Sequence, residues 1–250
     1  IFKDLKLHQI HEGATEITDG NYSAISKIVC ELKKGKPIQY IIGHTLFYNC
    51  TIEVNRNTLI PRQETEELVD LIIRENPDFS GTIADIGTGS GCIAIALAAN
   101  LPGSSVTATD ISAKALETAR RNAIINRVNI TFLEDDILEK TDKQGISAGI
   151  IVSNPPYIRS SEKKYMHRNV LEHEPAGALF VDDSDPLKYY RAILARAEKW
   201  LDSQGKIYFE INEALGCEMS KLMHLSGYSE IIVVKDLNGK DRIVKGRKNG

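Results

Sequence analysis

An asparagine, two prolines and a tyrosine stand in a row at residues 154–157, one residue beyond the apolar run of residues 148–152. The run predicts a buried strand, so the four residues fall at its carboxyl end, where open α/β sheets bind ligands. Two adjacent prolines remove two backbone donors and stiffen the turn, which leaves carbonyl oxygens and the Asn154 side chain as acceptors. A planar NH2 group needs such an acceptor pair. The tetrapeptide alone fits an ordinary strand-ending turn equally well.

A glycine-rich loop follows Asp85, between a predicted strand at residues 82–86 and a predicted helix at residues 92–100. Glycines permit a tight turn and a close approach of a ligand to the backbone, and a helix N-terminus favours an anion or carboxylate. The spacing Gly-x-Gly-x-Gly differs from the Gly-x-Gly-x-x-Gly of nicotinamide enzymes and is similar to the S-adenosylmethionine loop of class I methyltransferases. The loop residues are Gly87, Thr88, Gly89, Ser90 and Gly91.

Acidic residues also follow the next two predicted strands. Asp110 ends the strand at residues 105–110, where a carboxylate can accept from both ribose hydroxyls of a nucleotide; a lone Asp at a strand end is also a common helix cap. Asp136 and Ile137 follow the strand at residues 129–133, at the place for adenine contacts. We expect Asp136 to accept from the adenine amino group and Ile137 to pack on the ring. The acidic run of residues 134–136 is equally an ordinary polar loop.

An α/β framework is predicted to hold these residues together. Apolar residues at helical spacing predict helices over residues 64–74, 92–100 and 113–126. Between them lie predicted strands at residues 82–86, 105–110, 129–133 and 149–153, which indicates a mostly parallel sheet with helices on both faces. Further strands are predicted at residues 206–211, 231–234 and 242–244, the last two joined through Asn238-Gly239, a strong hairpin signal. The sheet is therefore expected to end with an antiparallel strand.

The first 60 residues have a different pattern. Ile25, Ile28, Val29 and Leu32 fall at helical spacing, and Gly35 could end that helix. We therefore predict a partial helical region over residues 1–36. Residues 37–43 and 46–54 are rich in β-branched and aromatic residues and predict a β-hairpin connector within residues 37–60. Residues 61–250 are expected to form the α/β domain.

Composition narrows the class of protein. The 250 residues carry a net charge of -3, which gives no overall bias toward nucleic acid; the basic residues between 240 and 248 are either a local patch or a solvated tail. The four scattered cysteines predict neither a disulfide framework nor a zinc site, and no metal is expected. We expect a cytoplasmic protein, because no signal peptide or membrane span is visible. Since the chain begins with Ile1 rather than Met, a missing N-terminal segment is also expected.

Several segments together resemble the HemK/PrmC family of glutamine N5-methyltransferases, which act on peptide chain release factors. Besides residues 154–157, the resemblance rests on residues 35–43, 59–66, 174–175, 178–179 and 236–242, so it runs from about residue 35 to the end. Residues 60–66, Ile-Pro-Arg-Gln-Glu-Thr-Glu, are the most specific part because generic methyltransferases lack them. Three positions depart from the family pattern: Gln63 replaces a usual proline, Asn212 a usual glycine, and Ile137 an aromatic residue found in some members.

The resemblance implies a class I, Rossmann-like methyltransferase with S-adenosyl-L-methionine as donor and S-adenosyl-L-homocysteine as product. Asn154 and the Pro155 carbonyl are expected to accept the two amide hydrogens of glutamine, with Pro156 and Tyr157 beside the substrate side chain. Arg62 and Glu64 either shape the cleft or form structural ion pairs. The donor is expected to be bound by Asp85, Gly87, Thr88, Gly89, Ser90, Gly91, Asp110, Asp136, Ile137 and Asn154.

The resemblance also implies partners, and two alternative functions remain open. Class 1 release factors are the expected partners, docked by residues 1–36, and a monomer without direct nucleic-acid contact is expected. Amino-directed nucleic-acid methyltransferases, acting on N6 of adenine or N2 of guanine, use the same Asn-Pro-Pro-Tyr chemistry but must also grip a phosphate backbone. A non-catalytic binding module with this fold is a rival of another class; the intact glycine loop and Asn154 argue against it.

Overall fold

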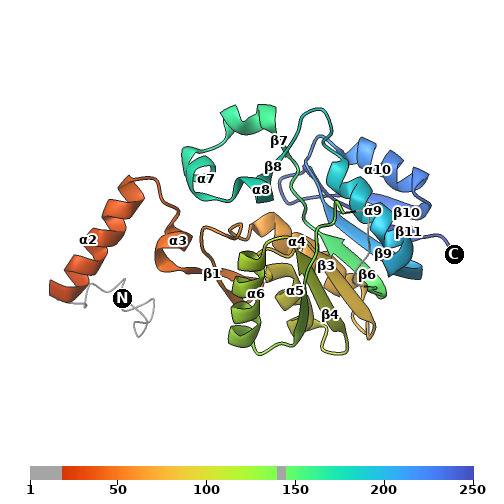
Figure 1. Cartoon of the computed structure of the whole chain (residues 1–250), viewed down its shortest axis with the longest axis horizontal. Helices are drawn as coiled ribbons and strands as arrows, with labels where there is room; N and C mark the ends of the chain where they lie inside the picture. The colour runs from red at the N-terminus through yellow and green to blue at the C-terminus, as the bar shows by residue number, and fades with distance from the viewer. Residues whose placement is uncertain (1–18, 140–144) are drawn as a thin grey trace.

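A seven-stranded sheet forms the centre of the computed structural model, which describes residues 19–139 and 145–250 (Figure 1). The strand order is β10-β11-β9-β6-β3-β4-β5. Strands β5, β4, β3, β6 and β9 run parallel to their neighbours in this order, as the helix–strand alternation predicted. The strands are β3 Thr82–Ile86, β4 Ser105–Asp110, β5 Ile130–Glu134, β6 Ala148–Ser153, β9 Leu201–Glu210, β10 Tyr228–Lys235 and β11 Asp241–Lys248.

The last strand of the chain, β11, is antiparallel to both of its neighbours, β9 and β10. This confirms the predicted antiparallel final strand, but β11 lies one place in from the edge, which β10 occupies. The basic residues between 240 and 248 consequently belong largely to a paired strand. The prediction of a solvated tail is wrong, because the Asn238-Gly239 turn returns the chain into the sheet.

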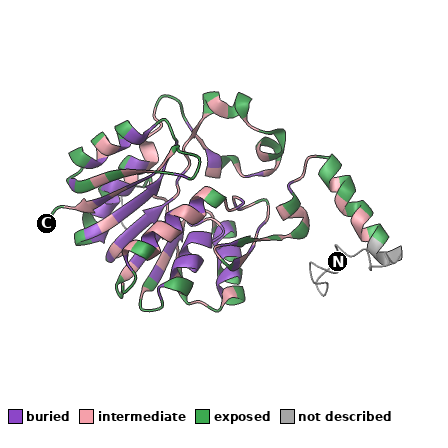
Figure 2. Ribbon diagram, turned by 180° about the vertical axis from the view of Figure 1, so that it is seen from behind, coloured by how far each residue is buried: buried purple, intermediate pink, exposed green. Residues whose placement is uncertain are grey.

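Helices cover both faces of the sheet, and the central strands are coloured largely as buried (Figure 2). Along β6, Ile150 and Val152 pack into one core cluster and Ile151 into the other, as the two-residue period of a strand requires. One cluster includes residues of α4 Gln63–Glu75, α5 Cys92–Asn100 and α6 Ala113–Asn126. The other includes residues of α9 Lys188–Trp200 and α10 Gly216–Leu225. These last two helices were not predicted from the sequence.

The predicted connector hairpin is wrong in its first arm. Residues 37–43 form a short helix, α3 Ile38–Ile42, because Pro37 starts it at φ -55° and Gly43 ends it in the left-handed region. The hairpin is instead β1 His44–Phe47 with β2 Cys50–Glu53. Its two-residue turn, Tyr48-Asn49, has positive φ at both positions, a twist that suits a tight hairpin. It docks on α6, where the Asn122 and Asn126 side chains accept backbone N–H groups of β2.

Two further segments flank the α/β body. The predicted N-terminal helix is present as α2 Asp19–Lys33, and Gly35 follows it at φ 83°; residues 1–18 of the predicted helical region lie outside the described residues. Between β6 and α9 the chain forms an insertion of five short elements. They are β7 Ile158–Arg159, η1 Ser160–Tyr165, α7 Arg168–His173, α8 Ala176–Leu179 and β8 Phe180–Val181. Within residues 19–139 and 145–250, no helix is long and apolar enough to cross a membrane.

Candidate active site

A cavity of about 330 Å³ opens at the carboxyl ends of β3, β4 and β6. The parallel strands bring to this one edge residues that are far apart in the sequence, as expected for an open α/β sheet. Three of the predicted site residues, Asp85, Gly91 and Tyr157, are not part of the cavity wall. The predicted residues that line it are Gly87, Thr88, Gly89, Ser90, Asp110, Asp136, Ile137, Asn154, Pro155 and Pro156.

The glycine loop turns the backbone toward the cavity. Gly87 and Gly89 have φ of 75° and 56°, and a Cβ atom on either would meet no atom within 4 Å. The positive φ is what requires glycine there, and the open space beside both residues belongs to the cavity. Gly91 has another role, since a Cβ atom there would come within 3.0 Å of the Ala119 Cβ. It lets α5 pack closely on α6.

Asp85 lies behind the loop and is completely buried. The Thr88 hydroxyl donates a hydrogen bond of 2.6 Å to its carboxylate, which fixes the loop from its buried side. Burial raises the pKa of Asp85 to about 7, partly opposed by the hydrogen bond from Thr88. In this structure Asp85 therefore holds the loop through Thr88. Its predicted contact with the donor stays a prediction.

Asp110 connects the loop to the start of α6. One carboxylate oxygen accepts the Gly89 N–H at 2.8 Å, and the other accepts the Ser112 N–H at 2.8 Å. The helix cap itself is the Ser112 side chain, which accepts from the Ala115 N–H. Burial raises the pKa of Asp110, and the two backbone hydrogen bonds oppose this rise. Asp110 thus lines the cavity as a positioned acceptor rather than as the cap of α6.

Two acidic residues, Asp135 and Asp136, follow β5, and both line the cavity. Asp135 forms a buried ion pair with Arg196 of α9, at 3.0 Å. Asp136 accepts the Leu138 N–H at 2.9 Å and, with Ile137, belongs to the cavity wall. The adjacent carboxylates therefore share the cavity wall but have different partners, which the sequence alone did not distinguish.

Asn154 is held by a line of hydrogen bonds that ends at a buried carboxylate. Its side-chain NH2 donates to the Thr65 hydroxyl at 3.2 Å, and that hydroxyl donates to Glu210 at 2.7 Å. The other Glu210 oxygen accepts from the Tyr157 hydroxyl at 2.9 Å. Burial raises the pKa of Glu210, while these two hydrogen bonds and the positive charge of Arg242 oppose the rise. Tyr157 thus faces Glu210, and its predicted contact with substrate stays a prediction.

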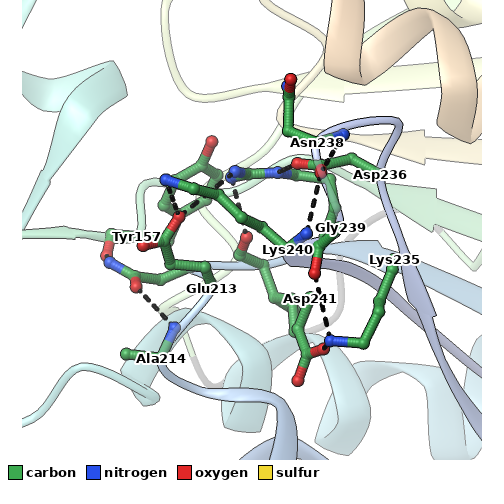
Figure 3. A network of polar contacts seen from close by, with 12 residues as sticks. Tyr157, Glu213, Ala214, Lys235, Asp236, Asn238, Gly239, Lys240 and Asp241 are labelled. Atoms are coloured by element: carbon green, nitrogen blue, oxygen red, sulfur yellow. Dashed lines mark hydrogen bonds and ion pairs between the residues drawn. The ribbon is translucent and has the colours of Figure 1, made fainter.

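Polar contacts also fix the β10–β11 turn next to Tyr157 (Figure 3). Asp236 accepts backbone N–H groups from Asn238 and Lys240 and binds the Arg242 guanidinium at 3.1 Å. Arg242 also donates to the Ile211 carbonyl at 3.3 Å. The guanidinium is therefore immobilised close to the Tyr157–Glu210 pair.

Sequence reasoning missed a second wall of the cavity. The segment before α4 contributes Pro61 and Arg62, and the first turn of α4 contributes Thr65. The insertion contributes Pro175 and Gly177. These were recognisable only as segments of the family resemblance, because nothing in their composition indicates a ligand.

Arg62 fits both of the interpretations left open from the sequence. It lines the cavity, and it is paired with Glu174 of the insertion at 2.5 Å. Glu64 lies in a neighbouring, more polar hollow together with Glu66. Among the described residues no cluster of His, Cys, Asp or Glu could hold a metal ion.

Comparisons with known proteins agree with this geometry. Residues 63–180 match the family model of the methyltransferase small domain. Two solved structures share the fold only: the hMettl16 catalytic domain in complex with MAT2A 3'UTR hairpin 6 (TM-score 0.62, 15% identity, 85% of this chain and 81% of that one) and ribosomal protein L11 methylase from Lactobacillus delbrueckii subsp. bulgaricus (0.56, 19%, 77% and 82%). The fold is that of the class I methyltransferases.

Relatives of known name are much more similar in sequence. The release factor glutamine methyltransferase of Flavobacterium psychrophilum is 52% identical over 87% of this chain and 78% of its own length. That of Bacteroides thetaiotaomicron is 47% identical over 90% and 80%, and that of Lactococcus lactis 39% over 96% and 87%. Identity at this level over most of both chains identifies the family. The chain therefore belongs to the release factor glutamine methyltransferases.

Proposed function

We propose that the chain transfers a methyl group from S-adenosyl-L-methionine to the side-chain amide nitrogen (N5) of the glutamine in the Gly-Gly-Gln motif of class 1 release factors. The shared name of the relatives supports the substrate. The observation that carries the chemistry is the orientation of Asn154. Its NH2 group faces Thr65, and no described residue donates to its Oδ1 atom, which leaves that oxygen for a ligand in the cavity.

The cavity wall fits the donor. Gly87 and Gly89 present backbone to open space, where the Met portion of the donor can approach closely, and Asp110 is proposed to accept from the ribose hydroxyls. Asp136 and Ile137 are proposed to contact the adenine. When bound, the donor supplies a methyl group already activated by its sulfonium.

The chain's own residues position the nucleophile. An amide nitrogen is weakly nucleophilic because its lone pair is delocalised into the carbonyl. Asn154 Oδ1 and the Pro155 carbonyl oxygen each accept one amide hydrogen, which aims the nitrogen at the methyl carbon and favours a pyramidal geometry. With the donor bound, the nitrogen would gain the methyl carbon, the donor would leave with the sulfur electron pair as S-adenosyl-L-homocysteine, and one amide proton would pass to solvent water. Alignment of this kind can contribute up to about 7–11 kcal/mol.

Three wider features complete the proposal. The helical region of residues 1–36, of which α2 is the described part, is proposed to dock the release factor. The protein is proposed to act as a monomer in the cytoplasm, where its substrate works. No contact with nucleic acid is needed for this reaction.

A methyl-transfer assay with labelled S-adenosylmethionine tests the proposal. The substrates are a purified release factor with Gly-Gly-Gln, its Gln→Ala variant, and adenine- and guanine-containing RNA and DNA. We expect label on the wild-type factor alone. For Asn154→Ala we expect a kcat lower by roughly 100-fold or more, because the substrate amide is no longer oriented toward the methyl group. Label on nucleic acid with none on the factor would instead favour the amino-directed nucleic-acid enzyme, and donor binding without transfer to any substrate would favour a binding module.

A further inference from the structure

The carboxamide of Asn154 can accept from a substrate amide in only one of its two orientations. Rotated by half a turn, it would present its NH2 group to the substrate NH2, and two donors would face each other. An asparagine side chain has no preference of its own for either orientation. Something around Asn154 must therefore select the orientation that turns Oδ1 toward the cavity.

A buried carboxylate makes that selection through one hydroxyl. Glu210 is 1% exposed, and an ionised carboxylate can only accept hydrogen bonds. The Thr65 hydroxyl has a single hydrogen and donates it to Glu210 at 2.7 Å. Its oxygen can then only accept from the Asn154 carboxamide 3.2 Å away. The NH2 group must face Thr65, and Oδ1 must face the cavity.

We propose that Thr65 and Glu210 are positioning residues, which fix the Asn154 carboxamide so that Oδ1 accepts from the glutamine amide. The inference rests on the proposed acceptor role of Asn154. Thr65 lies in the first turn of α4, Glu210 ends β9, and Asn154 follows β6. Three separate elements therefore meet at one hydrogen-bonded line, which a rigid core holds in place.

The surroundings of Glu210 keep its two oxygens in place as acceptors. The Tyr157 hydroxyl donates to the oxygen that Thr65 does not use, and the Tyr190 hydroxyl donates to the Glu210 backbone carbonyl at 2.9 Å. Burial raises the pKa of Glu210. The positive charge of Arg242 opposes this rise, whereas the negative charge of Glu64 in α4 adds to it. Arg242 is in turn held by Asp236, at 3.1 Å. The carboxylate thus accepts hydrogen bonds from Thr65 and Tyr157, and the charge of Arg242 stabilises its ionised form.

The substitution Thr65→Val tests the inference because valine keeps the shape of threonine and removes the hydroxyl. We expect kcat on the release factor to fall roughly 10- to 100-fold, as for other small misplacements of reacting groups, while the Kd for S-adenosylmethionine changes less than about threefold. Thr65→Ser, which keeps the hydroxyl, should restore most of kcat. The matched control is Thr118→Val. Thr118 is 1% exposed, against 3% for Thr65, and its hydroxyl is hydrogen-bonded to Asn55 and the Lys114 carbonyl. Loss of that hydroxyl should leave kcat unchanged.

A double-mutant cycle separates this inference from the proposed function. If Thr65 acts through Asn154, Thr65→Val should have almost no further effect on kcat in an Asn154→Ala background. Full activity of Asn154→Ala alone would overturn the acceptor role and with it this inference. A large loss of kcat for Asn154→Ala together with wild-type kcat for Thr65→Val would overturn the inference and leave the proposed function standing. The same conclusion would follow if the double variant lost kcat by the product of the two single losses.

Glu210→Gln keeps the test decisive if Thr65→Val folds poorly. The new amide can donate to Thr65, which frees the threonine hydroxyl to donate to Asn154 and removes the selection of one orientation. We expect the same loss of kcat with an unchanged Kd for the donor. Equal loss of donor binding and kcat in both variants would instead indicate a merely structural role and contradict the inference.

Discussion

At the scale of single residues, the carboxylate of Asp110 holds two backbone groups that belong to different elements. It accepts the Gly89 N–H of the loop and the Ser112 N–H at the start of α6. Hydrogen bonds to a charged group are worth about 1.5–3 kcal/mol, so this side chain shapes the loop before any donor arrives. The same oxygens are the acceptors proposed for the ribose.

Asp110→Asn should weaken donor binding. The new NH2 group would face a backbone N–H that now has no acceptor, so we expect the Kd for S-adenosylmethionine to rise roughly 10- to 100-fold, by the same hydrogen-bond energies. Isothermal titration calorimetry measures it. Asp182→Asn is the matched control, since Asp182 also accepts an N–H two residues on, but in an exposed turn. An unchanged Kd for Asp110→Asn would contradict a direct role in donor binding.

The residues that the sequence placed at the cavity lie in contiguous motifs or directly follow a predicted strand, as Asp110 does. Asn154 and the glycine loop each carry their chemistry within a few neighbouring positions, so type and spacing were sufficient. Thr65 and Glu210 were not identified, because their contact joins positions 145 apart and neither residue type indicates a ligand. Tyr157 was predicted to lie beside the substrate because the neighbouring residues of its motif were. In the structure its hydroxyl donates to Glu210, a contact that only the fold creates.

At the scale of elements, the insertion between β6 and α9 is attached to the segment before α4 by one buried side chain. Glu174, whose side chain is 1% exposed, binds the Arg62 guanidinium and the Ile60 N–H. Both segments line the cavity. The position of the insertion over the site therefore depends on this carboxylate.

Glu174→Gln should loosen the insertion. The variant loses the charge that pairs with Arg62 and one of two acceptor oxygens, which we expect to cost about 2 kcal/mol locally. Hydrogen exchange of residues 158–181 should accelerate, while exchange of β3 and β4 stays as in the wild type. Arg168→Gln, which breaks an exposed ion pair with Glu172 in the same insertion, is the control and should change little. Equal exchange in both variants would contradict the role of Glu174.

Elements were predicted well where hydrophobic period and glycine spacing agree. The four predicted strands between residues 82 and 153 and the three predicted helices between residues 63 and 126 have counterparts within one or two positions in the structure. Residues 37–43 were misassigned because a β-rich composition was weighed above Pro37 and Gly43, which start and end a short helix. The five short elements of the insertion have too few residues each to show a period, so only tertiary contacts define them.

At the scale of the whole molecule, a buried ionisable group under the glycine loop links stability to pH. Burial raises the pKa of Asp85 to about 7, whereas an unfolded chain has an Asp pKa near the ordinary value of about 3.9. Between these values the folded protein binds the proton more tightly than the unfolded chain does. The free energy of unfolding therefore falls as the pH rises through this window. The glycine loop thus lies over a group whose ionised form the fold disfavours.

Asp85→Asn removes this pH dependence, because the asparagine side chain is neutral at every pH in the window. The free energy of unfolding of the variant, relative to that of the wild type, should rise by roughly 2 to 3 kcal/mol from pH 5 to pH 8, since each pKa unit is worth about 1.4 kcal/mol. Urea unfolding without donor measures this difference at several pH values. Asp182→Asn should run parallel to the wild type, because the pKa of Asp182 is lowered by its hydrogen bonds to Ser184 and its titration ends below pH 5. A constant difference between Asp85→Asn and wild type would mean that Asp85 ionises normally, and the loop would then rest on a charge stabilised by other groups.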